Sequence, residues 1–179
     1  MLIVLLLAGQ AELCAQRYIT RSGTISFYSE APLENIEAVN NQVSSALDLE
    51  TGNFVFRVLM RAFQFEKALM QEHFNDNFLE SHNYPNASFE GKVKNLDAGE
   101  LNSGRTMEVE VDGKLTIKGV TKDVVETGTL VRDGDVIRGK SVFFILLADY
   151  GIRIPAAVSR NISPEIQITV DLELHPMNQ

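Results

Sequence analysis

The side chains that most often carry enzyme chemistry are sparse in this sequence. It contains three histidines, His73, His82 and His175, and one cysteine, Cys14. A serine or cysteine nucleophile needs a base at hydrogen-bond distance, and no Gly-x-Ser-x-Gly elbow is present to expose such a nucleophile. The sequence also has no glycine-rich phosphate loop. Because no acid–base set converges in the pattern, we expect neither a cofactor nor an enzymatic activity.

Two groups of polar residues could bind metal ions but are better explained as surface. His73 and His82 lie among carboxylates, but their spacing matches no His-Glu-x-x-His or related pattern. Glu108, Glu110 and Asp112 form an acidic row at alternate positions, which is typical of a solvated strand face that blocks edge pairing. The sequence therefore indicates no metal site.

The net charge argues against two classes of partner. The 179 residues include 16 lysines and arginines against 24 aspartates and glutamates, which gives a formal charge of −8. Nucleic-acid binding needs a basic face that releases counterions, and docking on anionic lipid needs basic residues too. We therefore expect no nucleic-acid partner and no electrostatic attachment to membranes.

The first residues are typical of a secretory signal peptide. Residues 1–8 read MLIVLLLA and are followed by the mostly small or polar segment GQAELCA, which ends at Ala15. This run is too short to cross a bilayer, which takes about 20 apolar residues, so we expect no stable membrane insertion. Cleavage after Ala15 would remove Cys14 and leave a chain without thiols, which suits an oxidising compartment. We predict a signal peptide over residues 1–15, one domain over residues 17–179, and a periplasmic or extracellular location. An ordinary N-terminal strand and a lipid anchor on Cys14 stay open as alternatives.

The body of the chain has the pattern of an antiparallel β-sheet. Between residues 107 and 117, apolar residues at odd positions alternate with polar residues at even positions, and residues 166–174 repeat this alternation. A period of two gives a strand one buried and one solvated face, which favours antiparallel over parallel pairing. Further strands are expected at residues 24–29, 42–49, 54–60, 88–94, 124–132 and 136–147.

Turn signals separate these strands and set the fold class. Glu50-Thr51-Gly52-Asn53 and Asp133-Gly134-Asp135 each join two strands, and an Asp-Gly loop is a strong hairpin signal. About eight strands result, the number at which a sheet can close into a barrel. Residues 66–74 differ because they are rich in helix formers, and Asn75-Asp76-Asn77 is expected to end that helix. The predicted fold is all-β: a closed antiparallel eight-stranded barrel with one helical excursion.

The phenylalanines carry the remaining signal. The sequence has ten of them, against four tyrosines and no tryptophan. Core packing explains any single one, because burying a phenylalanine stabilises a fold by about 1.5–3 kcal/mol. Together they also suit a lumen that holds a long hydrocarbon, since burial of apolar area is non-directional and leaves few marks in a sequence. A barrel filled by its own side chains and a hollow barrel therefore both fit the sequence.

Three segments of the chain resemble one known family. Residues 113–122 read GKLTIKGVTK, where Lys114, Thr116 and Lys118 are expected to face outward and Gly119 to permit a sharp turn. Upstream stand His-Phe at 73–74, Asn-Phe-Leu at 77–79, Tyr-Pro at 84–85 and Phe89; downstream stands Asp-Tyr-Gly-Ile at 149–152. In this order the segments resemble those of the YceI-like family, the lipocalin-like polyisoprenoid-binding proteins of bacteria.

The resemblance implies a periplasmic or secreted lipocalin-like barrel with an elongated apolar pocket. Its ligand would be an isoprenoid-type lipid, such as a polyprenyl lipid or a quinone tail, with Lys67, Arg153 and Arg160 as candidate donors to a polar headgroup at the rim. The alternative is a filled barrel that serves as a structural or protein-interaction module, and a homodimer is compatible with either. The residues expected to line the pocket are the inward alternates of the strands and three caps from the helical excursion: Phe54, Phe56, Val58, Phe63, Phe74, Phe78, Phe89, Val109, Val111, Leu115, Phe144, Ile168 and Val170.

Overall fold

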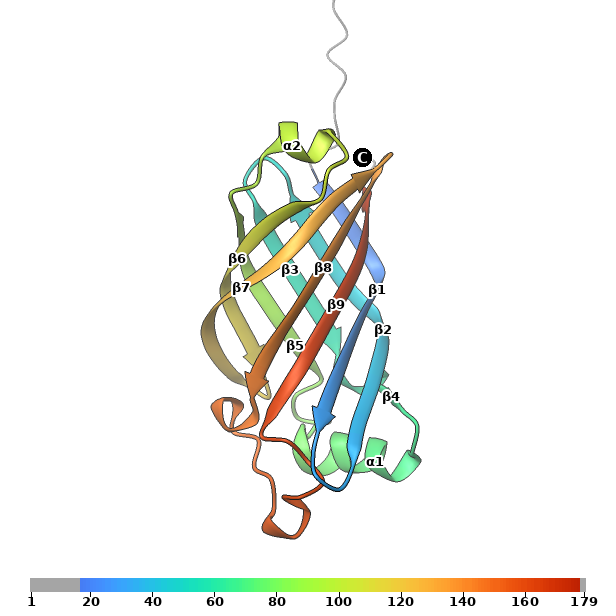
Figure 1. Ribbon diagram of the computed structural model, residues 1–179. Coiled ribbons are helices and arrows are strands. Elements are labelled where there is room, and N and C mark those ends of the chain that lie inside the picture. The colour runs from blue at the N-terminus through green and yellow to red at the C-terminus, as the bar shows by residue number, and fades with distance from the viewer. Residues whose placement is uncertain (1–16, 178–179) are drawn as a thin grey trace, which may run out of the picture.

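Strands wind around a central axis in the computed structural model, which describes residues 17–177 (Figure 1). The predicted signal peptide, residues 1–15, lies outside the described residues. The strands are β1 (Arg17–Glu30), β2 (Asn35–Asp48), β3 (Asn53–Leu59), β4 (Gln64–Phe65), β5 (Asn86–Lys94), β6 (Met107–Ile117), β7 (Val120–Asp133), β8 (Val136–Leu146) and β9 (Glu165–Pro176). The helical elements are η1 (Met60–Ala62), α1 (Ala68–His73), η2 (Phe74–Phe78), α2 (Ala98–Asn102), η3 (Leu147–Tyr150) and η4 (Ala156–Val158).

The sheet closes on itself as an up-and-down barrel. Each long strand pairs antiparallel with its neighbours in the order β1-β9-β8-β7-β6-β5-β3-β2, and a β1–β2 ladder completes the ring. The two-residue β4 adds a short ladder to β2 below the end of β3. The prediction of a closed eight-stranded antiparallel barrel is therefore confirmed. Figure 1 shows α1 beneath the lower end of the barrel, with α2 and the C-terminus at the upper end.

The two clearest predicted strands have the faces that their alternation indicates. In β6, Met107 and Val109 are buried, while Glu108 and Glu110 between them are exposed. The same holds in β9, where Val170, Leu172 and Leu174 are buried. Apolar side chains thus line the inside of the barrel, and the acidic row lies on the solvated outer face.

Strands β1 and β2 are far longer than predicted, because polar residues and bulges interrupt their patterns. Their ladder shifts register on both sides of Gly23, where an added Cβ would lie 2.5 Å from the Leu172 side chain. Asn40 is fully buried, yet its side chain donates to the Leu59 carbonyl oxygen at 2.9 Å and accepts from the Gln42 amide at 2.8 Å. A buried polar residue that satisfies its hydrogen bonds is stable in a core but breaks the apolar pattern on which strand prediction rests.

The helical excursion continues past the point where it was expected to end. Asn75-Asp76-Asn77 does not end the helix, because the chain goes on as one turn of π-helix, Phe74–Phe78. The Asn75 side chain donates to the Gln71 carbonyl oxygen at 2.9 Å and accepts from the Ser81 hydroxyl at 2.7 Å. These bonds stabilise a wider turn that aligns Phe74 and Phe78 with the lumen, and such turns are frequent at functional sites.

The β6–β7 turn has the sharp geometry that its glycine predicted, but one of its side chains lies elsewhere. Lys118 and Gly119 both have positive φ, 49° and 75°, and a Cβ on Gly119 would lie 2.7 Å from the Tyr84 ring. Lys118 was expected to face outward into solvent. Instead its side chain is only 15% exposed, and its ammonium group lies 2.8 Å from the Glu80 carboxylate. This ion pair joins the turn to the segment that follows the π-helical turn.

We expect the Glu80–Lys118 pair to make stability fall in acid. The hydrogen bond from Lys118 holds the pKa of the Glu80 carboxyl below its ordinary value of 4.5. The pair therefore stabilises the fold above that pH, and the contribution is lost as the pH falls through the lowered folded-state pKa. Lys118→Met should have a lower melting temperature than the unmodified protein at pH 7, and this difference in melting temperature should be smaller at pH 3. Equal differences at both pH values in thermal unfolding would contradict this assignment.

Candidate functional site: the barrel lumen

The inside of the barrel contains two adjoining chambers. The upper chamber has a volume of about 150 Å³ and is lined mainly by β3 and β5 to β9. The lower chamber, above α1, has a volume of about 480 Å³. Six residues line both chambers, so the two spaces lie end to end along the barrel axis: Ile25, Val58, Ala87, Ile117, Ile145 and Ile168.

Most of the predicted lining residues lie on the walls of these chambers, and their role in ligand binding stays a prediction. Nine line the upper chamber: Phe54, Phe56, Val58, Phe89, Val109, Val111, Leu115, Ile168 and Val170. Three more, Phe63, Phe74 and Phe78, line the lower chamber. Phe74 and Phe78 come from the helical excursion as expected, whereas Phe63 lies between η1 and β4.

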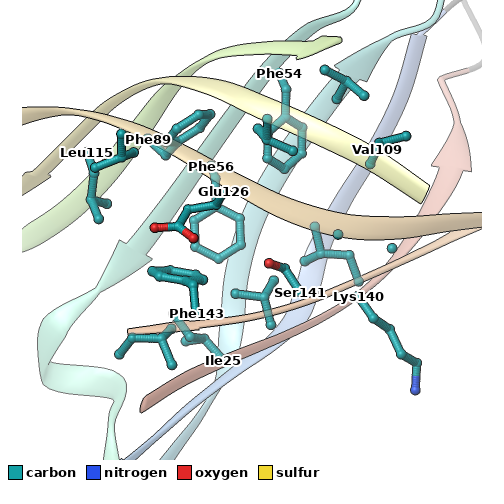
Figure 2. A pocket seen from close by; sticks show the side chains of 18 of the residues that line it. Ile25, Phe54, Phe56, Phe89, Val109, Leu115, Glu126, Lys140, Ser141 and Phe143 are labelled. Carbon is teal, nitrogen blue, oxygen red and sulfur yellow. The ribbon is translucent and has the colours of Figure 1, made fainter. Parts of the chain in front are cut away.

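The prediction for Phe144 is wrong. Its side chain is 55% exposed on the outer face, whereas Phe143 points into the upper chamber (Figure 2). The run Phe-Phe-Ile-Leu is apolar on both faces of the strand, so the alternation does not show which set points inward. The register decides it, because Phe143 pairs with the inward Ile168 of β9 and Phe144 with Gln167.

The lower chamber is built around an aromatic cluster of four residues, Phe27, Phe63, Phe65 and Phe74. Their ring centroids lie 5.1–5.6 Å apart, in tilted, edge-on and stacked arrangements. Each such contact contributes about 0.5–1.5 kcal/mol beyond area burial, so the cluster holds the π-helical turn against β1 and β4. Sequence reasoning did not place Phe27 and Phe65 at the site. The alternation of Ile25 and Phe27 with polar residues was an available signal for Phe27, whereas Phe65 lies on the two-residue β4, which is too short to show an alternation.

The rim of the lower chamber carries one of the three predicted polar donors. Lys67 lines this chamber, and its ammonium group lies 2.5 Å from the Glu34 carboxylate. That hydrogen bond lowers the pKa of the Glu34 carboxyl and raises the pKa of the Lys67 ammonium group. Arg153 and Arg160 are exposed and line neither chamber, so the structure does not place them where a headgroup could be bound.

The upper chamber contains a carboxylic acid that sequence reasoning missed. Glu126 of β7 lies opposite Val111 of β6 and follows the inward parity of Val124 and Leu130. Figure 2 shows its carboxyl group pointing into a space lined by aromatic rings. The available signal was that Glu126 lies an even number of positions from Val124 and Leu130, whose side chains point inward. A charged residue at such a position is nevertheless normally predicted to point outward into solvent.

The β7–β8 ladder ends close to this acid. Pairing runs only from Asp133↔Val136 to Thr129↔Lys140, so residues 120–128 of β7 pair with β6 alone. Just past the end of the ladder, the hydroxyl of Ser141 still donates to the Thr127 carbonyl oxygen at 2.6 Å, and this bond holds β7 and β8 together there. Glu126 therefore lies on a part of the wall with one strand neighbour, and it keeps partial access to solvent.

One protein family matches the sequence over most of its length. The model of the YceI-like domain family matches residues 20–174 of the chain. The chain belongs to the YceI-like domain family. No curated protein matches it.

Solved structures share the fold of this YceI-like domain at low sequence identity. A polyisoprenoid binding domain from Saccharophagus degradans, implicated in plant cell wall breakdown, is 15% identical with a TM-score of 0.77, over 91% of this chain and 99% of that one. BcnA of Burkholderia cenocepacia is 19% identical with a TM-score of 0.70, over 84% and 95%. The YCEI protein of Campylobacter jejuni is 17% identical with a TM-score of 0.64, over 83% and 90%.

The described residues of this YceI-like chain show neither a metal-binding cluster nor a membrane-spanning helix. Among residues 17–177, no group of three or more histidine, cysteine, aspartate or glutamate side chains is arranged to hold a metal ion. His73 lines the lower chamber, and His82 is exposed in the loop after the π-helical turn. Within the same described range, no helix has the length and apolar character needed to cross a membrane.

We expect Glu126 to make this YceI-like barrel less stable as the pH rises. Burial raises the pKa of its carboxyl above the ordinary value of 4.5. The folded state therefore holds its proton more tightly than the unfolded state, and stability falls as the pH rises from about 4.5 through the raised folded-state pKa. Glu126→Gln should melt at a higher temperature than the unmodified protein at pH 8, and the gap should narrow at pH 4. A gap that widens in acid would contradict the raised pKa.

Proposed function

We propose that this protein is a non-catalytic binding protein that holds an isoprenoid-type lipid, a polyprenyl or quinone tail, in its barrel. The observation that carries the proposal is the lower chamber of about 480 Å³, which continues into the upper chamber. Its volume lies within the range of about 300–1,000 Å³ typical of ligand pockets. The fold is shared with a structure described as a polyisoprenoid binding domain, which supports the same ligand class here.

The lining suits a branched hydrocarbon chain. The walls are mostly aliphatic and aromatic, and the polar groups of the lower chamber are few: Ser29, Glu34, Lys67, His73 and Asn161. Each buried methylene contributes about 0.8 kcal/mol of transfer free energy, so affinity grows with the length of tail enclosed. We propose that this gain, rather than directional contacts, holds the tail.

The alternative, a filled barrel that acts only through its outer surface, has less support. Packed protein interiors leave few voids larger than a water molecule, which needs about 10–15 Å³. A chamber of about 480 Å³ is far larger than such a void.

Release into the periplasm or the medium is part of the proposal and depends on the sequence of residues 1–15. The intact mass of the protein recovered from its own host tests it. We expect a mass that corresponds to cleavage near Ala15. A mass that includes residues 1–15 would contradict export by this route.

A matched pair of phenylalanine variants tests the location of the ligand. Phe143 lines the upper chamber, and its neighbour Phe144 is exposed. We expect Phe143→Ala to weaken binding of a fluorescent isoprenoid probe about tenfold, which corresponds to about 1.4 kcal/mol of lost burial. Phe144→Ala should bind the probe as the unmodified protein does. Equal losses in both variants would place the ligand outside the lumen.

A further inference from the structure

Glu126 is a charged residue on the wall of a chamber that is otherwise lined mostly by apolar side chains. Phe56, Phe89, Leu115 and Phe143 line the same upper chamber (Figure 2). Within residues 17–177, its carboxyl group makes no hydrogen bond and no ion pair. An unpaired polar group in such surroundings costs free energy, so a core that needed only apolar packing would be more stable with a leucine there.

The other polar groups near this chamber do not compensate for Glu126. Lys140 points outward, where its ammonium group lies 2.9 Å from Asp171 (Figure 2). Tyr150 and Asp149 lie on η3. Burial raises the pKa of the Tyr150 phenol, and the charges of Asp149 and Glu126 add smaller contributions in the same direction. Lys140 is thus paired elsewhere, and Asp149 carries the same charge as Glu126. No hydrogen bond joins Tyr150 to Glu126 in the described residues, so the hydrogen-bond partner of Glu126 is either water or a group on a bound ligand.

We propose that Glu126 accepts a hydrogen bond from a hydroxyl or protonated amine on the ligand, and thus selects lipids that carry such a donor. This inference rests on the proposed function, because it assumes that an isoprenoid-type chain occupies the lumen. The donor group would lie in the upper chamber of about 150 Å³ and the tail in the lower chamber of about 480 Å³. A phosphate headgroup does not fit this arrangement, because it would bring a second negative charge next to a carboxylate.

The aromatic walls favour the same class of headgroup. Three phenylalanines form one cluster in this chamber: the ring centroid of Phe54 lies 6.4 Å from that of Phe56 and 5.9 Å from that of Phe89. Ring faces are electronegative and attract a cationic group, while they tolerate a hydroxyl that is bonded elsewhere. A carboxylate among rings therefore suits an ammonium group best and an alcohol second.

The test compares probes that share one tail and differ only in the head. Geranylgeraniol and geranylgeranylamine can donate a hydrogen bond, whereas the methyl ether of geranylgeraniol cannot. We expect the unmodified full chain to bind the alcohol and the amine about tenfold more tightly than the ether. Equal affinities for all three would overturn the inference and leave the proposed function intact, whereas no binding of any probe would overturn both.

Variants at Glu126 distinguish an alcohol from an amine and control for folding. Glu126→Leu should lose the preference for donors and still bind the ether. Glu126→Gln keeps an acceptor oxygen but has no negative charge. It should still bind the alcohol more tightly than the ether, but it should no longer bind the amine more tightly than the ether. Asp123→Asn, on the exposed face of the same strand, should behave as the unmodified protein. A donor preference that survives in a folded Glu126→Leu variant, checked by thermal unfolding, would overturn the inference.

Discussion

Replacing Ala87 with phenylalanine is expected to abolish binding of a long isoprenoid chain while the barrel still folds. Ala87 lines both chambers, so its small side chain leaves the passage between them open. An aromatic ring at this position would block a tail that runs from one chamber into the other. We expect the affinity for a twenty-carbon probe to fall at least a hundredfold, and the affinity for a ten-carbon probe that fits the lower chamber to change little.

The control for this variant adds the same ring to the outer face. Val55 of β3 is 47% exposed, so Val55→Phe changes the size of a side chain that does not reach the lumen. Overpacking a core typically costs about 1–3 kcal/mol, so thermal unfolding of both variants should accompany the titrations. If the folded Ala87→Phe variant binds the long probe with unchanged affinity, the ligand does not pass through the junction.

The second large effect is expected from a pair of glycines under Phe89. Gly91 and Gly113 lie opposite each other on β5 and β6. A Cβ on Gly113 would lie 2.5 Å from the Glu90 carbonyl oxygen, 2.6 Å from the Gly91 Cα atom and 2.6 Å from the tip of the Phe89 ring. The two glycines therefore let the strands approach closely and make room for that ring in the lumen.

Gly113→Ala should accordingly lower the free energy of unfolding by about 2–4 kcal/mol, because two of the three contacts are with backbone atoms that cannot move aside. For a domain of this size, the melting temperature would fall by about 4–16 °C. Gly134→Ala is the matched control: no atom lies within 4 Å of its added Cβ, and its φ of 61° alone should cost about 1–2 kcal/mol. Equal destabilisation in the two variants, measured by denaturant unfolding, would contradict the packing argument.

The fold was predictable wherever one face of a strand is apolar and the other polar. Strand β6 has the predicted bounds, because Met107 and Val109 alternate with glutamates. In β1 and β2 the alternation is broken by satisfied polar residues such as Asn40, and only part of each strand could be predicted. Closure of the barrel followed from strand number, whereas the bulges near Gly23 depend on contacts between distant segments.

The lining residues of the site were predictable where the alternation along a strand shows which side chains point inward. Val109, Val111 and Leu115 follow from alternation alone. Phe143 and Phe144 are adjacent phenylalanines, and only the register with β9 shows which of them points inward. Glu126 was missed for the opposite reason, since its inward position contradicts its chemistry. A charged side chain that points into an apolar interior, and that has no hydrogen-bond or ion-pair partner inside the chain, is often functional.

Lipid extraction from the protein, purified from its own host and analysed by mass spectrometry, tests the central claim most directly. We predict one dominant isoprenoid-type species near one molecule per chain, carrying a hydroxyl or amine and absent from the Ala87→Phe variant purified in the same way. Protein that is free of lipid, with both chambers closed by its own side chains in an experimental structure, would contradict the account.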